Sequence, residues 1–210
     1  MENTEKWKWN ELASDEVIEK TVESLTLNGI TAIVVGTKED AKKKVLSLIP
    51  EKSEVMTMTS VTLDDVGVSD IINKSGKYNA TRDKIYLMDR NTQKMEMKKL
   101  GSTPEYVVGS IHAITEDGKL IIASKTGSQL PAYAYGAGKV IFVAGAQKIV
   151  KNLDEAMKRI YDYVLPLESE RANKAYNITE GSGVNKMLII NKEVEKDRIF
   201  IIIIKEKIGF

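Results

Sequence analysis

Residues 106–145 read YVVGSIHAITEDGKLIIASKTGSQLPAYAYGAGKVIFVAG, and this stretch decides the fold. Residues 106–114 and 120–124 are apolar, β-branched runs typical of strands, and the Asp117-Gly118 pair between them indicates a tight hairpin turn. A polar loop and a short helical segment follow. Residues 140–143 are then a continuous apolar run, the pattern of a strand buried on both faces. The stretch therefore predicts a hairpin, a loop, a short helix and a buried strand, with its polar atoms in the two glycine-containing turns.

The rest of the chain alternates between predicted helices and strands. Residues 31–35 and 54–58 are predicted strands, and Thr37 can cap the helix between them. Asn152 can cap a later helix, which has the most regular apolar stripe in the chain. A further short strand is predicted over residues 84–88. We therefore expect a sheet whose strands are connected by helices.

The predicted fold is an α/β three-layer sandwich, α/β/α, around a mostly parallel, Rossmann-like sheet with a hairpin in the central stretch and a C-terminal hairpin. The C-terminal hairpin is predicted from two apolar runs, 187–190 and 199–204, which a charged connector separates and which would close one edge of the sheet. No internal repeat or low-complexity tract divides the chain. We expect a single domain over residues 1–210, with an N-terminal helical segment at 1–28 and the C-terminal strand pair at 184–210.

The composition is that of an ordinary globular protein: 42% of the residues are hydrophobic, 29% are charged, and 31 basic side chains balance 30 acidic ones. This balance argues against a nucleic-acid partner. The N-terminus is unlike a signal peptide and no apolar run can span a bilayer, so we expect a cytoplasmic protein without membrane insertion. With no cysteine, the chain cannot hold a cysteine-ligated iron–sulfur cluster or a cysteine-ligated zinc ion, and one histidine excludes a histidine-rich metal site. A magnesium site made of carboxylates is still compatible with the sequence.

Two groups of hydroxyl side chains are candidate ligand-binding residues. The loop after the hairpin offers hydroxyls, the Lys125 cation and flexible backbone N–H groups, which together suit a phosphate or carboxylate. Its candidate residues are Ser124, Thr126, Gly127 and Ser128. Thr59 and Ser60 directly follow a predicted strand, and open α/β sheets bind ligands at the carboxyl ends of strands. Each group also has a structural alternative: an ordinary capped turn for the loop, and a helix cap for Thr59 and Ser60.

His112 is the only imidazole, and strand alternation places it on the opposite face from Ile111 and Ala113. It can be a general acid or base, or a packed and hydrogen-bonded side chain. The pairs Gly136-x-Gly138 and Gly181-x-Gly183 precede strands, whereas a dinucleotide-binding loop follows one. A Rossmann-type cofactor site is therefore not predicted.

Six motifs extend in order over most of the chain. They are ITEDG at 114–118, Ala123-Ser124-x-x-Gly127, VIFVAGAQKIV at 140–150, Ala156-x-x-Arg159-Ile160, Leu165-Pro166-x-Glu168 and Arg171-Ala172. In this order they resemble the LUD (lactate-utilisation) domain family. The resemblance implies a fold like that of the sugar-phosphate isomerase and CoA-transferase group. It also implies kinship with a small, cysteine-poor subunit encoded with the iron–sulfur proteins of bacterial L-lactate oxidation.

The resemblance makes Glu116 a candidate catalytic nucleophile. CoA-transferases of the related fold use a glutamate followed by glycine near a strand end, and Thr115-Glu116-Asp117-Gly118 is similar. Gly118 would let a substrate approach closely. The family also has a Ser or Thr comparable to Thr59 and Ser60. The alternative is that Glu116 and Asp117 are polar turn residues. We expect the Glu116 turn and the 126–128 loop to approach each other in space.

Three functions are compatible with these observations. The first is an auxiliary component of lactate or related 2-hydroxy-acid utilisation that binds a small anionic ligand or iron–sulfur partner proteins. The second is a stand-alone enzyme of the isomerase/CoA-transferase-like group acting on a phosphorylated or CoA-linked acid. The third is an interaction subunit that docks through Trp7 and Trp9, although packing of these side chains on the domain is the commoner arrangement. A homo-oligomer is compatible with each.

Overall fold

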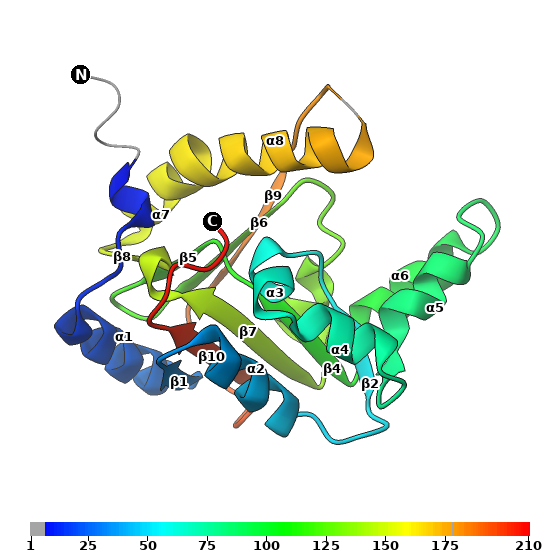
Figure 1. Cartoon of the computed structure of the whole chain (residues 1–210), viewed down its shortest axis with the longest axis horizontal. Helices are drawn as coiled ribbons and strands as arrows, with labels where there is room; N and C mark the ends of the chain where they lie inside the picture. The colour runs from blue at the N-terminus through cyan, green and yellow to red at the C-terminus, as the bar shows by residue number, and fades with distance from the viewer. Residues whose placement is uncertain (1–6, 178) are drawn as a thin grey trace.

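The computed structural model of the chain describes residues 7–177 and 179–210. The polar residues 1–6, which predict no signal peptide, and the side chain of Trp7 lie outside the described part. The described residues form two sheets and the helices that pack on them (Figure 1). No helix in these ranges is long and apolar enough to cross a membrane.

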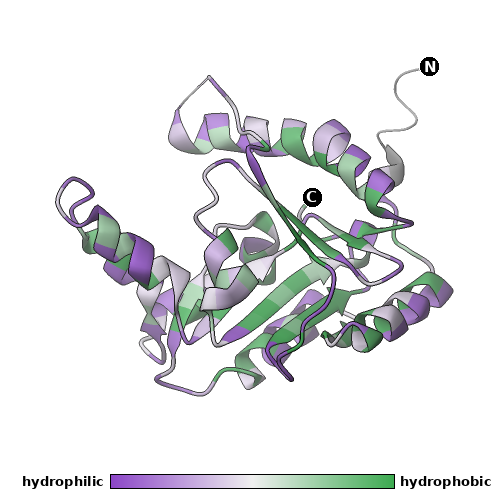
Figure 2. Ribbon diagram, turned by 180° about the vertical axis from the view of Figure 1, so that it is seen from behind, coloured by the Kyte–Doolittle hydropathy of each residue, from purple (hydrophilic) through white to green (hydrophobic). Residues whose placement is uncertain are grey.

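Six parallel strands form the main sheet. In spatial order they are β1 (Thr31–Val35), β10 (Ile199–Ile204), β7 (Lys139–Gly145), β4 (Tyr106–Ser110), β2 (Glu54–Thr57) and β3 (Asn79–Ala80). The interior strands β10 and β7 are largely apolar and buried, as expected for strands covered on both faces. Figure 2 shows this distribution, with hydrophobic residues along the strands and hydrophilic residues on the outer sides of the helices.

Helices cover both faces of the main sheet, which confirms the predicted α/β/α arrangement. The helices on one face are α2 (Lys38–Ser47), α3 (Val61–Val66) and α4 (Val68–Lys74). The opposite face carries α1 (Asp15–Leu27) and the π-helical turn η2 (Ala132–Gly136). The predicted cap at Thr37 is confirmed, since its hydroxyl accepts the N–H of Asp40 at 3.2 Å.

A second, mixed sheet of four strands packs on the α1 side. Its order is β8 (Ile149–Val150), β5 (Ala113–Thr115), β6 (Leu120–Ser124) and β9 (Lys186–Ile190). Ile122 on its inner face joins the same core as α1, and the outer face packs against α7 (Leu153–Lys158) and η4 (Arg159–Val164). Trp9, in η1 (Trp7–Asn10), is only 5% exposed and joins this outer cluster, so it packs within the chain.

The central hairpin is confirmed, but the strand that precedes it is shorter than predicted. β5 and β6 pair antiparallel around the Asp117-Gly118 turn. The expectation of one strand over residues 106–114 is wrong, because the chain leaves the main sheet at Ile111 and His112. β4 ends before this point and β5 begins after it in the other sheet. One apolar run therefore supplies a strand to each sheet.

The two C-terminal strands form as predicted, but they pair differently from the expected hairpin. β9 runs antiparallel to β6 in the second sheet, whereas β10 lies between β1 and β7 in the main sheet. The reason is burial: β10 is a run of six residues, five of them isoleucine, which needs cover on both faces, and an edge strand would leave it exposed.

Residues 84–87 are helical and no strand forms over 84–88, so the strand predicted there is wrong. The helical residues belong to α5 (Thr81–Leu87), which pairs with α6 (Lys94–Ser102) in an arm that projects from the domain (Figure 1). Tyr86 and Leu87 are exposed at 60% and 89%. No sheet edge receives these residues, and helical hydrogen bonds satisfy the backbone instead.

Candidate functional site

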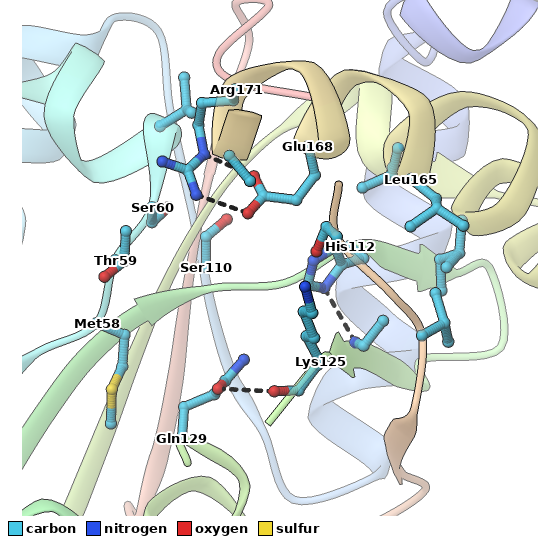
Figure 3. Close-up of a pocket in the computed structure, with 18 of the residues that line it drawn as sticks. Met58, Thr59, Ser60, Ser110, His112, Lys125, Gln129, Leu165, Glu168 and Arg171 are labelled. Atoms are coloured by element: carbon cyan, nitrogen blue, oxygen red, sulfur yellow. Dashed lines mark hydrogen bonds and ion pairs between the residues drawn. The ribbon is translucent and has the colours of Figure 1, made fainter. Parts of the chain in front are cut away.

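A cavity of about 330 Å³ lies where the carboxyl ends of β2 and β4 face the end of β6 and helix α8 (Leu165–Tyr176) (Figure 3). This is the end of a parallel sheet at which α/β proteins bind ligands. Most of the lining comes from residues 58–62, 110–112, 123–126, 128–129, 181–184 and from α8. The volume suits a small organic molecule.

The first notable group in the cavity wall is the ammonium of Lys148. This residue ends the turn η3 (Ala146–Lys148) after β7 and is 2% exposed. Its Nζ donates to Thr62 Oγ1 at 3.0 Å, to Ser110 Oγ at 3.1 Å and to the carbonyl oxygen of Ile111 at 3.1 Å. Burial holds the pKa of Lys148 well below its usual value, and the nearby Arg159 lowers the pKa further. Among the described residues, no carboxylate forms an ion pair with it.

Arg159 lies behind the cavity wall and is fully buried. Its Nη1 donates to the carbonyl oxygen of His112 at 2.5 Å, and its guanidinium stacks 5.3 Å from the centroid of the Tyr163 ring. Its Nε and Nη2 have no hydrogen-bond partner among the described residues. Burial lowers the pKa of Arg159 to about 10, which still leaves it charged at neutral pH. Unpartnered buried donors of this kind call for an explanation.

His112 presents a hydrogen-bond donor to the cavity. Its Nδ1 accepts the N–H of Ala123 at 3.1 Å, so the neutral ring carries its proton on Nε2. Burial lowers the pKa of His112 to about 3, and the charges of Lys148 and Arg159 add to the effect. The ring is therefore neutral at physiological pH. The sequence left two alternatives, a general acid or base and a packed, hydrogen-bonded side chain. His112 is packed and hydrogen-bonded, and it also lines the cavity.

The loop predicted to bind an anion does reach the cavity. Ser124, Thr126 and Ser128 line it, whereas Gly127 does not. All three hydroxyls also order the loop: Ser124 Oγ accepts the N–H of Gly127 at 2.8 Å, and Thr126 Oγ1 donates to Ser128 Oγ at 3.1 Å. Gly127 has φ +82°, a left-handed backbone conformation that favours glycine, so it shapes the turn of the loop.

Thr59 and Ser60 also line the cavity, on the side opposite the hairpin loop (Figure 3). Ser60 caps α3, because its Oγ accepts the N–H of Leu63 at 3.4 Å. Thr59 Oγ1 accepts a hydrogen bond of 2.6 Å from Arg82 Nη2. The helix-cap alternative is therefore correct for Ser60, and both residues still face the cavity.

Glu116 and Gly118 lie away from the cavity. The Glu116 carboxylate forms an ion pair of 2.7 Å with Lys20 on α1. The Glu116 turn lies at one end of β6 and Ser124 lies at the other. The two ends of this five-residue strand are roughly 13 Å apart. The expectation that the two turns meet is therefore wrong. At Gly118, with φ +80°, an added Cβ would lie 2.7 Å from the main chain of Ser24, so this glycine allows α1 to pack closely.

Helix α8 covers the cavity. Its Arg171 forms a two-pronged pair with Glu168, with both nitrogen–oxygen distances 2.7 Å (Figure 3). The Glu168 carboxylate raises the pKa of Arg171 above its usual value. Pro166 lies in the first turn of α8, where a missing N–H leaves no helical hydrogen bond unmade.

Lys148, Arg159 and Ser110 are site residues that were not predicted from the sequence. Lys148 and Arg159 occur in the motifs that resemble the LUD family, which was the available signal. Burial was not visible, since a lysine or arginine among polar residues is normally exposed.

Comparison with known proteins agrees with this architecture. The family model described as LUD domain matches residues 18–204. The solved structure of a DUF162 family protein from Deinococcus radiodurans is similar, with a TM-score of 0.56 and 9% identity, over 92% of this chain and 99% of that one. No curated protein matches the chain. The chain thus has an α/β fold of the kind seen in that structure, with a polar cavity at the carboxyl ends of its strands.

The chain belongs to the LUD domain family. Weaker likenesses extend to a D-ribose-5-phosphate isomerase in complex with phospho-erythronic acid, with a TM-score of 0.38 and 13% identity, over 82% of this chain and 96% of that one. An eIF2B beta from Chaetomium thermophilum has a TM-score of 0.38 and 10% identity, over 67% of this chain and 48% of that one. These scores are too low to support a conclusion about function.

Proposed function

We propose that the cavity binds a small organic anion, a carboxylate or phosphate ester, and that this binding serves a process related to lactate or another 2-hydroxy acid. The observation that carries the proposal is a pair of buried basic side chains, Lys148 in the cavity wall and Arg159 behind it, neither of which has a carboxylate ion-pair partner among the described residues. Burial disfavours an unpaired charge on either side chain, and a bound anion supplies the counter-charge that favours the cationic form.

Other groups in the wall suit the same ligand. The neutral His112 offers an Nε2–H donor, and the hydroxyls of Thr126 and Ser128 offer further hydrogen bonds. Membership of the LUD family supports a role related to lactate utilisation in general terms. In such a role the chain would be an auxiliary component that binds its anion alone or together with iron–sulfur partner proteins, since a chain without cysteine cannot ligate a cluster through thiolates.

A second candidate function is a stand-alone enzyme that acts on a phosphorylated or CoA-linked acid. The observation that favours it is the same Lys148, because a buried amine with a lowered pKa is suited to catalysis as well as to binding. Glu116 remains a proposed catalytic residue only for a substrate that reaches the hairpin turn, where it is paired with Lys20.

A thermal-shift screen tests the anion site. The purified chain is heated with lactate, pyruvate, inorganic phosphate, sugar phosphates and short acyl-CoA esters in turn. A ligand that binds only the folded state at about 100 times its Kd stabilises that state by about 2.7 kcal/mol, which raises the melting temperature. We expect at least one anion to raise it, and Lys148→Met to abolish the rise.

Lys98→Met is the matched control, because Lys98 is an exposed lysine on α6 that does not line the cavity. It is expected to keep the full shift. Absence of a shift with every anion in the wild type contradicts the proposal. An equal shift in the wild type and in Lys148→Met places the ligand elsewhere.

A further inference from the structure

We propose that Ser110 is a nucleophile and Lys148 its general base, so that the cavity accepts the acyl group of an activated small acid, an oxyester or thioester, on Ser110 and passes it to water. The two residues come from different strands. Ser110 is the last residue of β4, and Lys148 follows the neighbouring strand β7. Both line the cavity.

The contact between the two side chains is direct. Lys148 Nζ lies 3.1 Å from Ser110 Oγ; the ammonium donates across this contact, and the neutral amine accepts the hydroxyl proton over the same distance. Thr62 Oγ1 and the carbonyl oxygen of Ile111 hold the amine from two other sides. A nucleophile in hydrogen-bond contact with a base that further groups orient is the arrangement by which activated serines are recognised.

The surroundings of Lys148 favour the neutral amine that a base requires. The side chain is buried, the described residues provide no ion-pair partner, and the charged Arg159 is close. Burial and the charge of Arg159 lower the pKa of Lys148 well below its usual value, against a smaller opposing effect of Asp65, and so favour the neutral amine with its free electron pair.

A donor for the reacting carbonyl is also present. The Nε2–H of His112 has no protein partner in the part of the chain that the structure describes, and its ring lines the same cavity as Ser110. A neutral N–H donor stabilises the oxyanion that forms when a carbonyl is attacked. In Figure 3, the side chains of Ser110 and His112 lie beneath α8, which carries Glu168 and Arg171.

The chemical steps balance with water as co-reactant. Lys148 Nζ takes the proton of Ser110 Oγ as the oxygen bonds to the acyl carbon, and the bond from that carbon to the alcohol or thiol breaks. The leaving group takes the proton from Lys148. Water then attacks the acyl-serine, Lys148 transfers the water's proton to Ser110 Oγ, and a carboxylic acid is released. The resulting carboxylate is an anion of the class proposed above, although the acylation itself does not depend on that proposal.

The test is acylation by p-nitrophenyl acetate and, separately, by the acetyl thioester of N-acetylcysteamine. We expect a burst of product and one acetyl group per chain by intact mass, which peptide mapping places on Ser110. Ser110→Ala abolishes the label, and Lys148→Met slows it by roughly 10²–10⁴-fold, the usual contribution of a general base. Labelling by only one of the two probes tells whether an oxyester or a thioester is the substrate.

Two controls keep the outcome decisive. Ser47→Ala and Lys98→Met alter exposed side chains away from the cavity and are expected to be acylated at the wild-type rate. Mapping of the label in the wild type needs no variant, so misfolding of Ser110→Ala does not obscure the result. Label on another residue, or none with either probe, overturns the assignment. An anion-induced thermal shift that persists in that case shows that only the acyl-transfer role has failed.

Discussion

The main-chain carbonyl oxygen of His112 accepts a hydrogen bond of 2.5 Å from Nη1 of Arg159. This contact holds a fully buried guanidinium at the point where the chain crosses from the main sheet to the second sheet. Nε and Nη2 of the same group have no hydrogen-bond partner among the described residues. Such an arrangement costs stability, and costs of this kind are concentrated at functional sites.

Arg159→Met tests whether this cation serves binding. We expect the free energy of unfolding to change by no more than about 1 kcal/mol, because removal of an uncompensated buried charge offsets the loss of the hydrogen bond to the His112 carbonyl oxygen. We expect the affinity for the anion to fall at least tenfold, about 1.4 kcal/mol. Urea unfolding and calorimetric titration measure the two quantities.

Arg198→Met is the matched control for that variant. Arg198 is also buried, but its Nη1 pairs with Glu193 at 2.7 Å and its other nitrogens donate to main-chain carbonyls, including that of Ala137. Its removal should lower the free energy of unfolding by about 3 kcal/mol or more, because a partly buried carboxylate and three main-chain carbonyls lose their donors. Equal losses in Arg159→Met and Arg198→Met would show that Arg159 is a structural residue.

His112 makes stability depend on pH. Its pKa is about 3 in the folded chain, against about 6.5 when unfolded. Between these values the unfolded state binds a proton that the folded state does not, so the free energy of unfolding falls as the pH falls, by up to about 1.4 kcal/mol per pH unit. Urea unfolding from about pH 7 to about pH 4 should show a smaller slope for His112→Gln. Identical slopes in the two proteins would contradict the buried neutral ring.

Gly118→Ala should destabilise the chain by about 2 kcal/mol or more. The residue combines φ +80° with a Cβ position 2.8 Å from Leu25 N on α1, so conformational strain and a backbone clash add together. Gly76→Ala is the control, because Gly76 has φ +72° but nothing within 4 Å of the added Cβ. Thermal unfolding should show a clearly larger drop for Gly118→Ala; equal drops would exclude the packing role.

Glu116→Gln should leave anion binding unchanged. The carboxylate is paired with Lys20 and absent from the cavity lining, so its charge has no direct contact with the ligand. The variant should also unfold close to the wild-type temperature, since exposed ion pairs contribute little. A loss of ligand-induced thermal shift in Glu116→Gln would restore this residue to the site.

The fold could be predicted where local patterns decide it. Thr37 and Asn152 cap helices as predicted, and the Asp117-Gly118 turn joins two strands. Which strands pair with each other could not be predicted in the same way, because pairing depends on which faces of a strand other elements cover. β10 lies inside the main sheet for this reason. The apolar run that is interrupted at His112 contributes one strand to each sheet.

The site was predictable only in part. Thr59 follows β2 of the parallel sheet and Ser124 ends β6 of the mixed sheet, and both line the cavity because the ends of these two strands face it. Glu116 was misplaced because its likeness to the CoA-transferase glutamate suggested a site role, although the strand predicted over residues 120–124 already separates its turn from the loop. Lys148 and Arg159 were missed because sequence alone does not show that a cation is buried.

Isothermal titration calorimetry decides whether the cavity is an anion site. The anion with the largest thermal shift is titrated into the wild type, Lys148→Met and Lys98→Met. We expect one anion per chain in the wild type and in Lys98→Met, and at least about a tenfold loss of affinity in Lys148→Met. Equal affinity in all three proteins, or no binding by the wild type, would contradict the anion site.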